Sequence, residues 1–317
     1  PDNVAVLASL GIDLFDLARC REAAANGVML TSWGPRWPLD HEETSLDAQA
    51  NHMMKALDEV RSSIQSGQLR TLANRQSLSS PRLVEHLRRH QELMLKHEGN
   101  LASHKPASTP FPCFSPNALT DPLVADWERF MQSTYEAPEP VRTVMILLPC
   151  SARKPYRLSK SHGQFFRSIS STGFHEVMMT SPLGLVPRDL EDVWPASNYD
   201  VPVTGDWTQD ELARVRRMLI SLVKRTGYKQ IINHTDMDLD FLEVDVVNTR
   251  QNQGATNFDA LARLSSAVKD AKATHELRNQ KNNLRLKQHF MSIARKTTGT
   301  DAWCHDLVVR GKLPRWR

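Results

Sequence analysis

The sequence has few cysteines and no long apolar run. Its 317 residues include 4 cysteines, which are far apart and form no Cys-x-x-Cys pair. This spacing argues against a disulfide framework and against a cysteine-rich zinc site, and it fits a reduced, cytoplasmic setting. The longest aliphatic or methionine run, Val144 to Leu148, is far shorter than the ~20 residues that span a bilayer. We therefore expect no membrane association, and the first residues show no signal-peptide pattern.

Neither sign of charge is in large excess, but the two signs are unevenly spread. The chain has 40 Lys or Arg and 36 Asp or Glu, and 40% of its residues are apolar, a globular balance that excludes wholesale disorder. Residues 261–317 hold 13 Lys or Arg against 4 Asp or Glu. This basic end favours a polyanion partner such as RNA or DNA, although a solvated lysine-rich helix explains it equally well. The candidate nucleic-acid-binding residues are Lys281, Arg285, Lys287, Arg295 and Lys296.

Apolar periodicity predicts two helices early in the chain. The first is expected over 47–66, where apolar side chains recur at helical spacing. The second is expected over 81–96, because Ser80 can cap it and Pro81 suits its first position.

After about residue 141, apolar runs that predict strands alternate with helical patterns. The predicted strands are 143–148, 177–180, 229–233 and a half-exposed one at 241–247. Helices are expected between them, including one that begins at a capping box of Thr208 and Glu211 and ends at Gly227. This order predicts an α/β fold with a three-layer core and a largely parallel sheet.

The length favours about two domains, and we expect four regions in all. They are a helical region at 1–98, a proline-rich linker at 99–140 around one short helix, an α/β core at 141–256 and a basic helical region at 257–317.

The strongest signal of chemistry follows the first core strand. Cys150 stands at the expected carboxyl end of that strand, where ligands bind in open α/β sheets. Lys154 and His162 are near enough in sequence to lower the pKa of such a thiol and make it a nucleophile. A buried cysteine in an ordinary strand–helix loop explains the same residues equally well on general grounds.

The motif around Cys150 resembles the signature of archaeosine synthase, a paralogue of archaeal tRNA-guanine transglycosylase. The matching positions are Pro149, Cys150, Lys154, Pro155, Tyr156, Ser159 and His162. Segments 181–188 and 199–205, and His234, also match in order, so that the resemblance covers 141–250 well and 1–66 weakly.

The weaker part, 1–66, resembles the end of the transglycosylase barrel. Asp16 stands where true transglycosylases have their nucleophile, but we expect a solvated loop residue because the rest of the barrel is missing upstream. Asn51 occupies the position of the zinc histidine, and the zinc cysteines are absent, so we expect no metal site. No other cofactor is expected.

The resemblance implies that an amine, that of free lysine in the family's reaction, adds to the nitrile of 7-cyano-7-deazaguanine in tRNA. A partner radical SAM enzyme then converts the adduct to archaeosine. The implied catalytic residues are Cys150 as the nucleophile that forms a thioimide, Lys154 as its stabiliser, and His162 or Tyr156 as the proton donor. The implied substrate-binding residues are Ser159, Ser181, Asp200, Thr204 and His234.

Two alternatives remain open at this point. The same base chemistry on DNA would use the same residues. A non-catalytic nucleic-acid-binding subunit that completes a transglycosylase-like barrel supplied by another chain would use the weakly matching start of the sequence instead.

Overall fold

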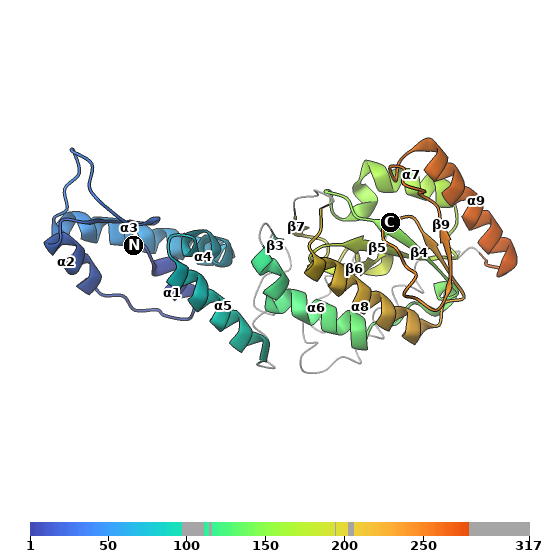
Figure 1. The fold of residues 1–317 in the computed structure, drawn as a ribbon, viewed down its shortest axis with the longest axis horizontal. Helices are drawn as coiled ribbons and strands as arrows, with labels where there is room; N and C mark the ends of the chain where they lie inside the picture. Colours follow the sequence, from blue (N-terminus) through green and yellow to red (C-terminus); the bar gives the residue numbers. More distant parts are fainter. Residues whose placement is uncertain (97–110, 114–115, 194, 202–205, 279–317) are drawn as a thin grey trace. The chain divides into compact units, whose positions relative to one another are not determined.

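The computed structural model describes the chain except for residues 97–110, 114–115, 194, 202–205 and 279–317 (Figure 1). It divides into two compact units, Pro1–His97 and Glu98–Arg317.

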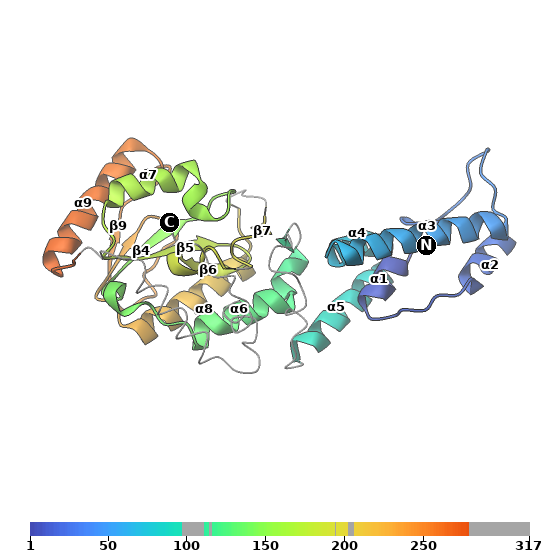
Figure 2. The ribbon, with the colours of Figure 1, turned by 180° about the vertical axis from the view of Figure 1, so that it is seen from behind.

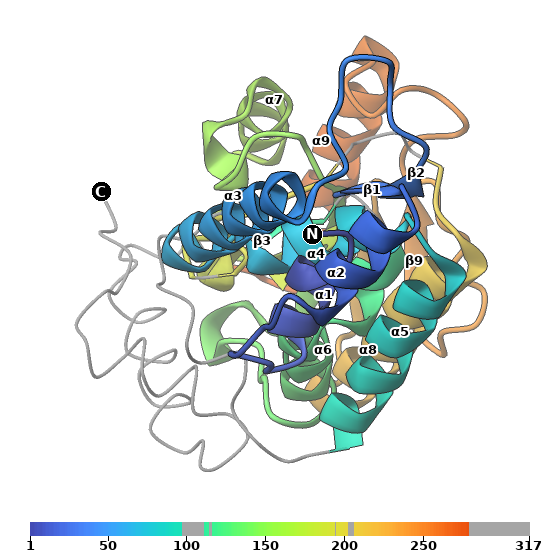
Figure 3. The ribbon, with the colours of Figure 1, turned by 90° about the vertical axis from the view of Figure 1, so that its left-hand side faces the viewer.

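The first unit is mainly helical. Its elements are α1 (Val4–Ser9), α2 (Ala18–Ala25), β1 (Met29–Thr31), β2 (Gly34–Arg36), α3 (Leu46–Gln65), α4 (Leu69–Ser77) and α5 (Pro81–Lys96). The two predicted helices are confirmed as α3 and α5. The short helices α1, α2 and α4 were not predicted, because none of them is long enough to show a clear apolar period. Strands β1 and β2 pair as an antiparallel hairpin (Figure 3).

Two buried glutamines connect the helices of this unit. The side chain of Gln76 accepts a hydrogen bond from the Ala5 amide over 2.7 Å and donates to the Pro1 carbonyl over 2.9 Å. Gln49 accepts from the Leu30 amide over 3.2 Å and donates to a second backbone carbonyl. These bonds satisfy backbone groups that regular structure leaves unpaired. The likeness of this region to the end of a transglycosylase barrel stays a prediction.

The second unit is an α/β structure. Its elements are β3 (Phe111–Pro112), η2 (Pro116–Thr120), α6 (Pro122–Ser133), η3 (Glu139–Val141), β4 (Val144–Pro149), η4 (Tyr156–Leu158), α7 (Lys160–Ile169), β5 (His175–Thr180), β6 (Gly184–Pro187), η5 (Arg188–Leu190), β7 (Tyr199–Asp200), α8 (Gln209–Thr226), β8 (Gln230–Asn233), β9 (Asp245–Asn248) and α9 (Phe258–Thr274). Five strands form one sheet in the order β6-β5-β4-β8-β9, and only β6 is antiparallel to its neighbour.

Helices cover both faces of this sheet. Helices α6 and α8 pack together on one face, and α7 and α9 pack together on the other (Figures 1 and 2). The predicted α/β class and largely parallel sheet are confirmed. Strand β9 begins at Asp245, later than the expected 241, and the antiparallel strand β6 was not predicted.

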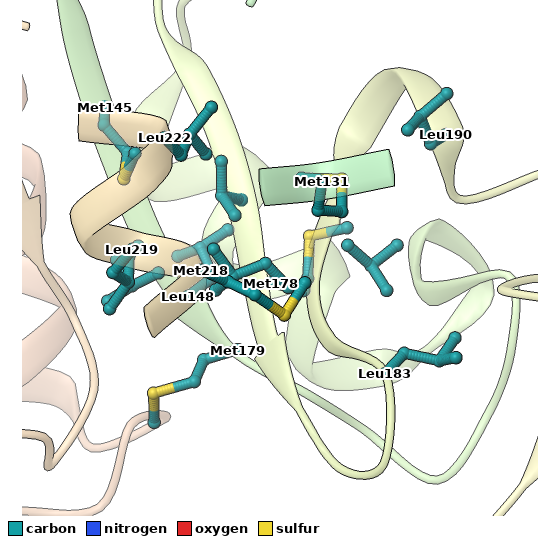
Figure 4. Close-up of a cluster of buried hydrophobic side chains, with 14 of the residues drawn as sticks. Met131, Met145, Leu148, Met178, Met179, Leu183, Leu190, Met218, Leu219 and Leu222 are labelled. Carbon is teal, nitrogen blue, oxygen red and sulfur yellow. The ribbon is translucent and has the colours of Figure 1, made fainter. Parts of the chain in front are cut away.

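The core on the α6–α8 face is rich in methionine. Met131, Met178 and Met218 are fully buried and meet leucines of the sheet and of α8 (Figure 4). Gly184, at the start of β6, has a φ of +79°, and a Cβ there would overlap the Sδ atom of Met218. Only glycine fits both the backbone and the space at this position.

The expected linker contains a core helix. Trp127 and Phe130 of α6 are fully buried, and the Trp127 indole donates a hydrogen bond to the Leu185 carbonyl over 2.9 Å. Asp121 caps α6 through the Leu123 amide. Proline content suggested a linker, but the apolar face of a single 12-residue helix makes this stretch part of the sheet's covering layer.

The basic region is described only in part. Helix α9 confirms the start of the expected helical stretch, whereas residues 279–317 lie outside the described part of the chain. Among the helices that the structure describes, none is long and apolar enough to cross a membrane.

Candidate functional site

Cys150 follows the last residue of β4 directly. It is partly buried and packs against the main apolar core of its unit. Burial raises the pKa of the Cys150 thiol, while a hydrogen bond with the Thr180 side chain and the charge of Lys154 act in the opposite direction. The thiol therefore sits at the carboxyl end of a central parallel strand, as the sequence predicts, beside a hydroxyl and an amine.

Lys154 places its amine inside the site. The Nζ atom is buried and has no hydrogen-bond partner among the described residues, and it lies 4.2 Å from the centroid of the Tyr199 ring. Burial lowers the pKa of Lys154, and the negative charges that Cys150, Asp200 and Cys113 carry when ionised oppose this shift. Such an amine is available to a ligand or to a neighbouring acid.

Three hydroxyl groups lie beside Cys150 and Lys154. The Tyr156 hydroxyl contacts the Tyr199 hydroxyl, which in turn contacts the Thr180 hydroxyl. Burial raises the pKa of both tyrosines, so they stay protonated at neutral pH. Because Thr180 also lowers the pKa of Cys150, the three hydroxyls lie beside the thiol.

His162 is fully buried and both of its ring nitrogens are engaged. Its Nε2 atom lies 3.1 Å from the Pro149 carbonyl, and its Nδ1 atom lies 3.1 Å from Nη2 of Arg188. Burial, together with the charge of Arg188, lowers the pKa of His162 to about 3. The imidazole is therefore neutral and has no free nitrogen for substrate, which favours a structural role over the expected proton donation.

Arg188, the residue that follows β6, connects His162 to two carboxylates. Its guanidinium donates to Glu176 over 2.6 Å and to Glu191 over 3.1 Å. Glu191 also accepts a hydrogen bond from the Arg157 amide in the motif loop, over 3.0 Å. This network connects the loop that contains Arg157 to β5 and to the segment after β6.

Ser159 and Ser181 are held by local contacts. The Ser159 hydroxyl accepts from the His162 amide over 3.2 Å and so caps α7. Ser181 follows β5 and donates to Glu211 of α8. Glu211 also completes the capping box with Thr208 that the sequence predicts.

His234 and Asp200 differ in their surroundings. His234 follows β8 and is buried, with Nδ1 2.7 Å from the Thr249 hydroxyl and Nε2 2.8 Å from the Ala255 carbonyl. Asp200 has an exposed side chain on β7, close enough to Lys154 to influence its pKa. Asp200 thus belongs to the same site as the Cys150 thiol and the Lys154 amine, whereas both ring nitrogens of His234 are used in contacts with the neighbouring loop.

Some expected site residues lie outside the described part of the chain. These are Thr204, Lys281, Arg285, Lys287, Arg295 and Lys296. In the ranges that the structure describes, no group of three or more His, Cys, Asp or Glu side chains is arranged to hold a metal ion. No residue set for a cofactor was predicted, and the residues that the sequence missed are Thr180, Tyr199, Arg188 and Cys113.

Comparisons with known proteins show similarity over this region and over most of the rest of the chain. A family model described as a domain of unknown function, DUF5591, matches residues 124–268. An archaeosine synthase subunit alpha of Thermoplasma acidophilum is 32% identical over 76% of this chain and 46% of its own length. A protein of the same name from Methanosarcina acetivorans is 29% identical over 100% of this chain and 57% of its own length.

A third relative, the archaeosine synthase of Methanocaldococcus jannaschii, is 28% identical over 86% of this chain and 47% of its own length. The chain thus spans about half the length of the curated relatives it matches. These similarities cover most of the chain, and the Pro149–His162 motif folds around Cys150 at the end of the central strand. The chain belongs to the archaeosine synthase family.

Proposed function

We propose that this chain adds an amine, that of free lysine, to the nitrile carbon of 7-cyano-7-deazaguanine in tRNA. The product is an intermediate that a separate radical SAM enzyme converts to archaeosine. The observation that carries the proposal is the position of Cys150 at the carboxyl end of β4, beside a buried amine that has no partner among the described residues. Membership of the archaeosine synthase family supports the choice of base.

The residue types suit a nitrile, which is a modest electrophile. A Cys150 thiolate attacks the nitrile carbon to give a thioimide, and the amine then displaces the sulfur. Asp200 is the acidic group best placed to bind the ammonium of the incoming amine, because its side chain is exposed and close to Lys154. The Tyr156 hydroxyl, kept protonated by burial, can donate a hydrogen bond that stabilises the developing imide nitrogen.

We assign His162, Ser159 and His234 to positioning rather than to chemistry. His162 and His234 use both ring nitrogens in protein contacts, and Ser159 caps the helix that carries His162. Their effect on substrate is therefore indirect, through the shape of the loop that holds Cys150.

Mass spectrometry of the modified base tests the function. The purified chain is incubated with lysine and with tRNA that carries 7-cyano-7-deazaguanine, and the digested nucleosides are weighed. We expect the nucleoside mass to rise by that of lysine, with Cys150→Ala abolishing the product and Cys20→Ala, a change at another buried cysteine, preserving it.

Three results would count against the proposal. Full activity of Cys150→Ala would show that lysine attacks the nitrile directly. Product on a DNA oligonucleotide in place of tRNA would select the other polymer. Absence of any product with wild-type protein would favour the non-catalytic nucleic-acid-binding alternative.

A further inference from the structure

The thiol of Cys150 must lose its proton before it attacks, and the structure limits which group can accept that proton. Both nitrogens of His162 are bonded to Pro149 and Arg188. Burial keeps the phenols of Tyr156 and Tyr199 protonated, so neither is a base. Of the described groups that act on the thiol, the Lys154 amine is the remaining candidate.

We propose that Lys154 is the proton carrier of this site, which takes the proton of the Cys150 thiol and returns it to the nitrile nitrogen. The inference rests on the function proposed above and assigns a step within it. It depends on three features of the geometry: the Nζ atom is buried, it has no hydrogen-bond partner among the described residues, and it lies over the Tyr199 ring.

These features make both protonation states of Lys154 accessible. An ammonium that lacks an acceptor in a buried position is costly, which favours the neutral amine. The face of the Tyr199 ring, 4.2 Å away, gives the ammonium partial compensation. Burial moves the pKa of Lys154 down and that of Cys150 up, so the two groups approach one another in basicity. Matched basicity is what reversible proton transfer requires.

Two other ionisable groups near Lys154 favour the protonated form of its amine when they are negatively charged. They are Asp200 on β7 and Cys113, the residue that follows β3, and the Cys113 amide donates to the Asp200 carbonyl over 2.7 Å. When ionised, both favour the ammonium and thus the ion pair formed with the Cys150 thiolate.

Each step balances. The Lys154 amine accepts the thiol proton, which leaves a thiolate and an ammonium. The thiolate forms a C–S bond as one π bond of the nitrile breaks, and the nitrile nitrogen takes its new proton from the Lys154 ammonium. The incoming amine then attacks the same carbon, the C–S bond breaks, and the proton released by the amine passes through Lys154 to the departing sulfur.

Two substitutions separate proton transfer from charge. Lys154→Met removes the amine, and Lys154→Arg keeps a positive charge that cannot be released near neutral pH. The first measurement is the rate at which iodoacetamide alkylates Cys150 as a function of pH, followed by the mass of the Cys150 peptide. The second is the single-turnover rate of addition to the nitrile in tRNA.

We expect Lys154→Met to slow both reactions, alkylation by about tenfold and addition by ~10²–10⁴-fold. We expect Lys154→Arg to keep alkylation near the wild-type rate and still lose addition to a similar extent. Addition by Lys154→Arg within about threefold of wild type would overturn the proposal, because charge alone would then suffice. Unchanged alkylation in Lys154→Met would overturn it as well.

The alkylation measurement needs no nitrile substrate, so its outcome is independent of the proposed function. If wild-type protein forms no product but Lys154→Met still slows alkylation, the function is wrong and the thiol–amine pair is right. Thermal unfolding of both variants shows whether they fold. If Lys154→Met does not fold, Lys154→Arg still tests the proposal, because Arg is similar in length to Lys.

Discussion

The Nη2 atom of Arg188 lies 3.1 Å from Nδ1 of His162. A guanidinium only donates, so Nδ1 accepts, and Nε2 must carry the proton that it donates to the Pro149 carbonyl. One neutral imidazole thus joins the last residue of β4 to the segment after β6. The histidine of the motif holds in place the loop that presents Cys150, and its conformation depends on an arginine 26 residues away in the sequence.

This arrangement makes stability depend on pH through His162. Its pKa falls from 6.5 to about 3 on folding, so the unfolded chain binds a proton at pH values where the folded chain does not. Stability from the neutral ring is present above pH 6.5 and is lost as the pH falls toward 3. We expect the difference in unfolding free energy between wild type and His162→Gln to fall by about 1.4 kcal/mol per pH unit in this range.

Urea unfolding at pH 7.5, 6 and 5 measures that difference. The same substitution at His41, whose side chain is exposed in the first unit, controls for the loss of one imidazole. A difference that stays constant with pH would show that folding does not lower the pKa of His162.

Gly184 should tolerate no side chain. Its φ of +79° and its approach to Met218 mean that Gly184→Ala strains the backbone and overpacks the core. We expect a loss of about 2–4 kcal/mol in unfolding free energy, measured by urea denaturation. Gly163→Ala in α7 is the matched control: among the described residues, and apart from the backbone of its own helix, its Cβ would approach only Nη1 of Arg167, at 3.9 Å. This change should gain about 0.5–1 kcal/mol. Equal effects of the two changes would contradict this account.

The sequence predicts most of the second unit because its strands and caps are local signals. The apolar run that becomes β4, the capping box at Thr208 and the stop at Gly227 each depend on a few adjacent residues. Strand β6 was not predicted because it is short, follows Pro182 closely and ends at Pro187, a composition typical of a loop, and its pairing with β5 is not a local signal. The helix around Trp127 was predicted, but its burial depends on the distant Leu185.

The features of the site also fall into local ones, which the sequence predicts, and non-local ones, which it does not. The position of Cys150 and the cap at Ser159 follow from neighbours in sequence. The interactions that decide which groups are free for chemistry are not local: Arg188 reaches His162 from 26 residues away, and Tyr199 reaches Tyr156 from 43 residues away. The motif therefore identifies His162 but does not show that both of its ring nitrogens are already engaged by protein groups.

Arg225 should contribute far more to stability than a neighbouring surface arginine. From α8 it donates to the carbonyls of Met131, over 2.6 Å, and of Tyr135, over 2.8 Å, at the end of α6. Removing it leaves these acceptors without a charged donor, so we expect Arg225→Met to cost about 1.5–3 kcal/mol. Arg217, whose half-exposed side chain pairs with Glu128, should cost less than about 1 kcal/mol when changed to Met. Thermal and urea unfolding measure both, and similar losses would show that the α6 carbonyls gain little from Arg225.

The basic end of the chain should bind phosphates of tRNA. Residues 261–317 hold 13 Lys or Arg against 4 Asp or Glu, which favours binding to a polyanion backbone and the release of its counterions. Five residues are changed to Gln together: Lys281, Arg285, Lys287, Arg295 and Lys296. We expect weaker binding to tRNA and a salt dependence whose logarithmic slope shrinks by up to about 0.9 for each phosphate that the protein no longer neutralises.

The control changes five exposed basic residues of the first unit, Lys55, Arg61, Arg82, Arg88 and Arg89, and so removes the same charge. If both sets lower the slope equally, net charge alone explains the binding, and if neither does, the basic end is only a solvated surface.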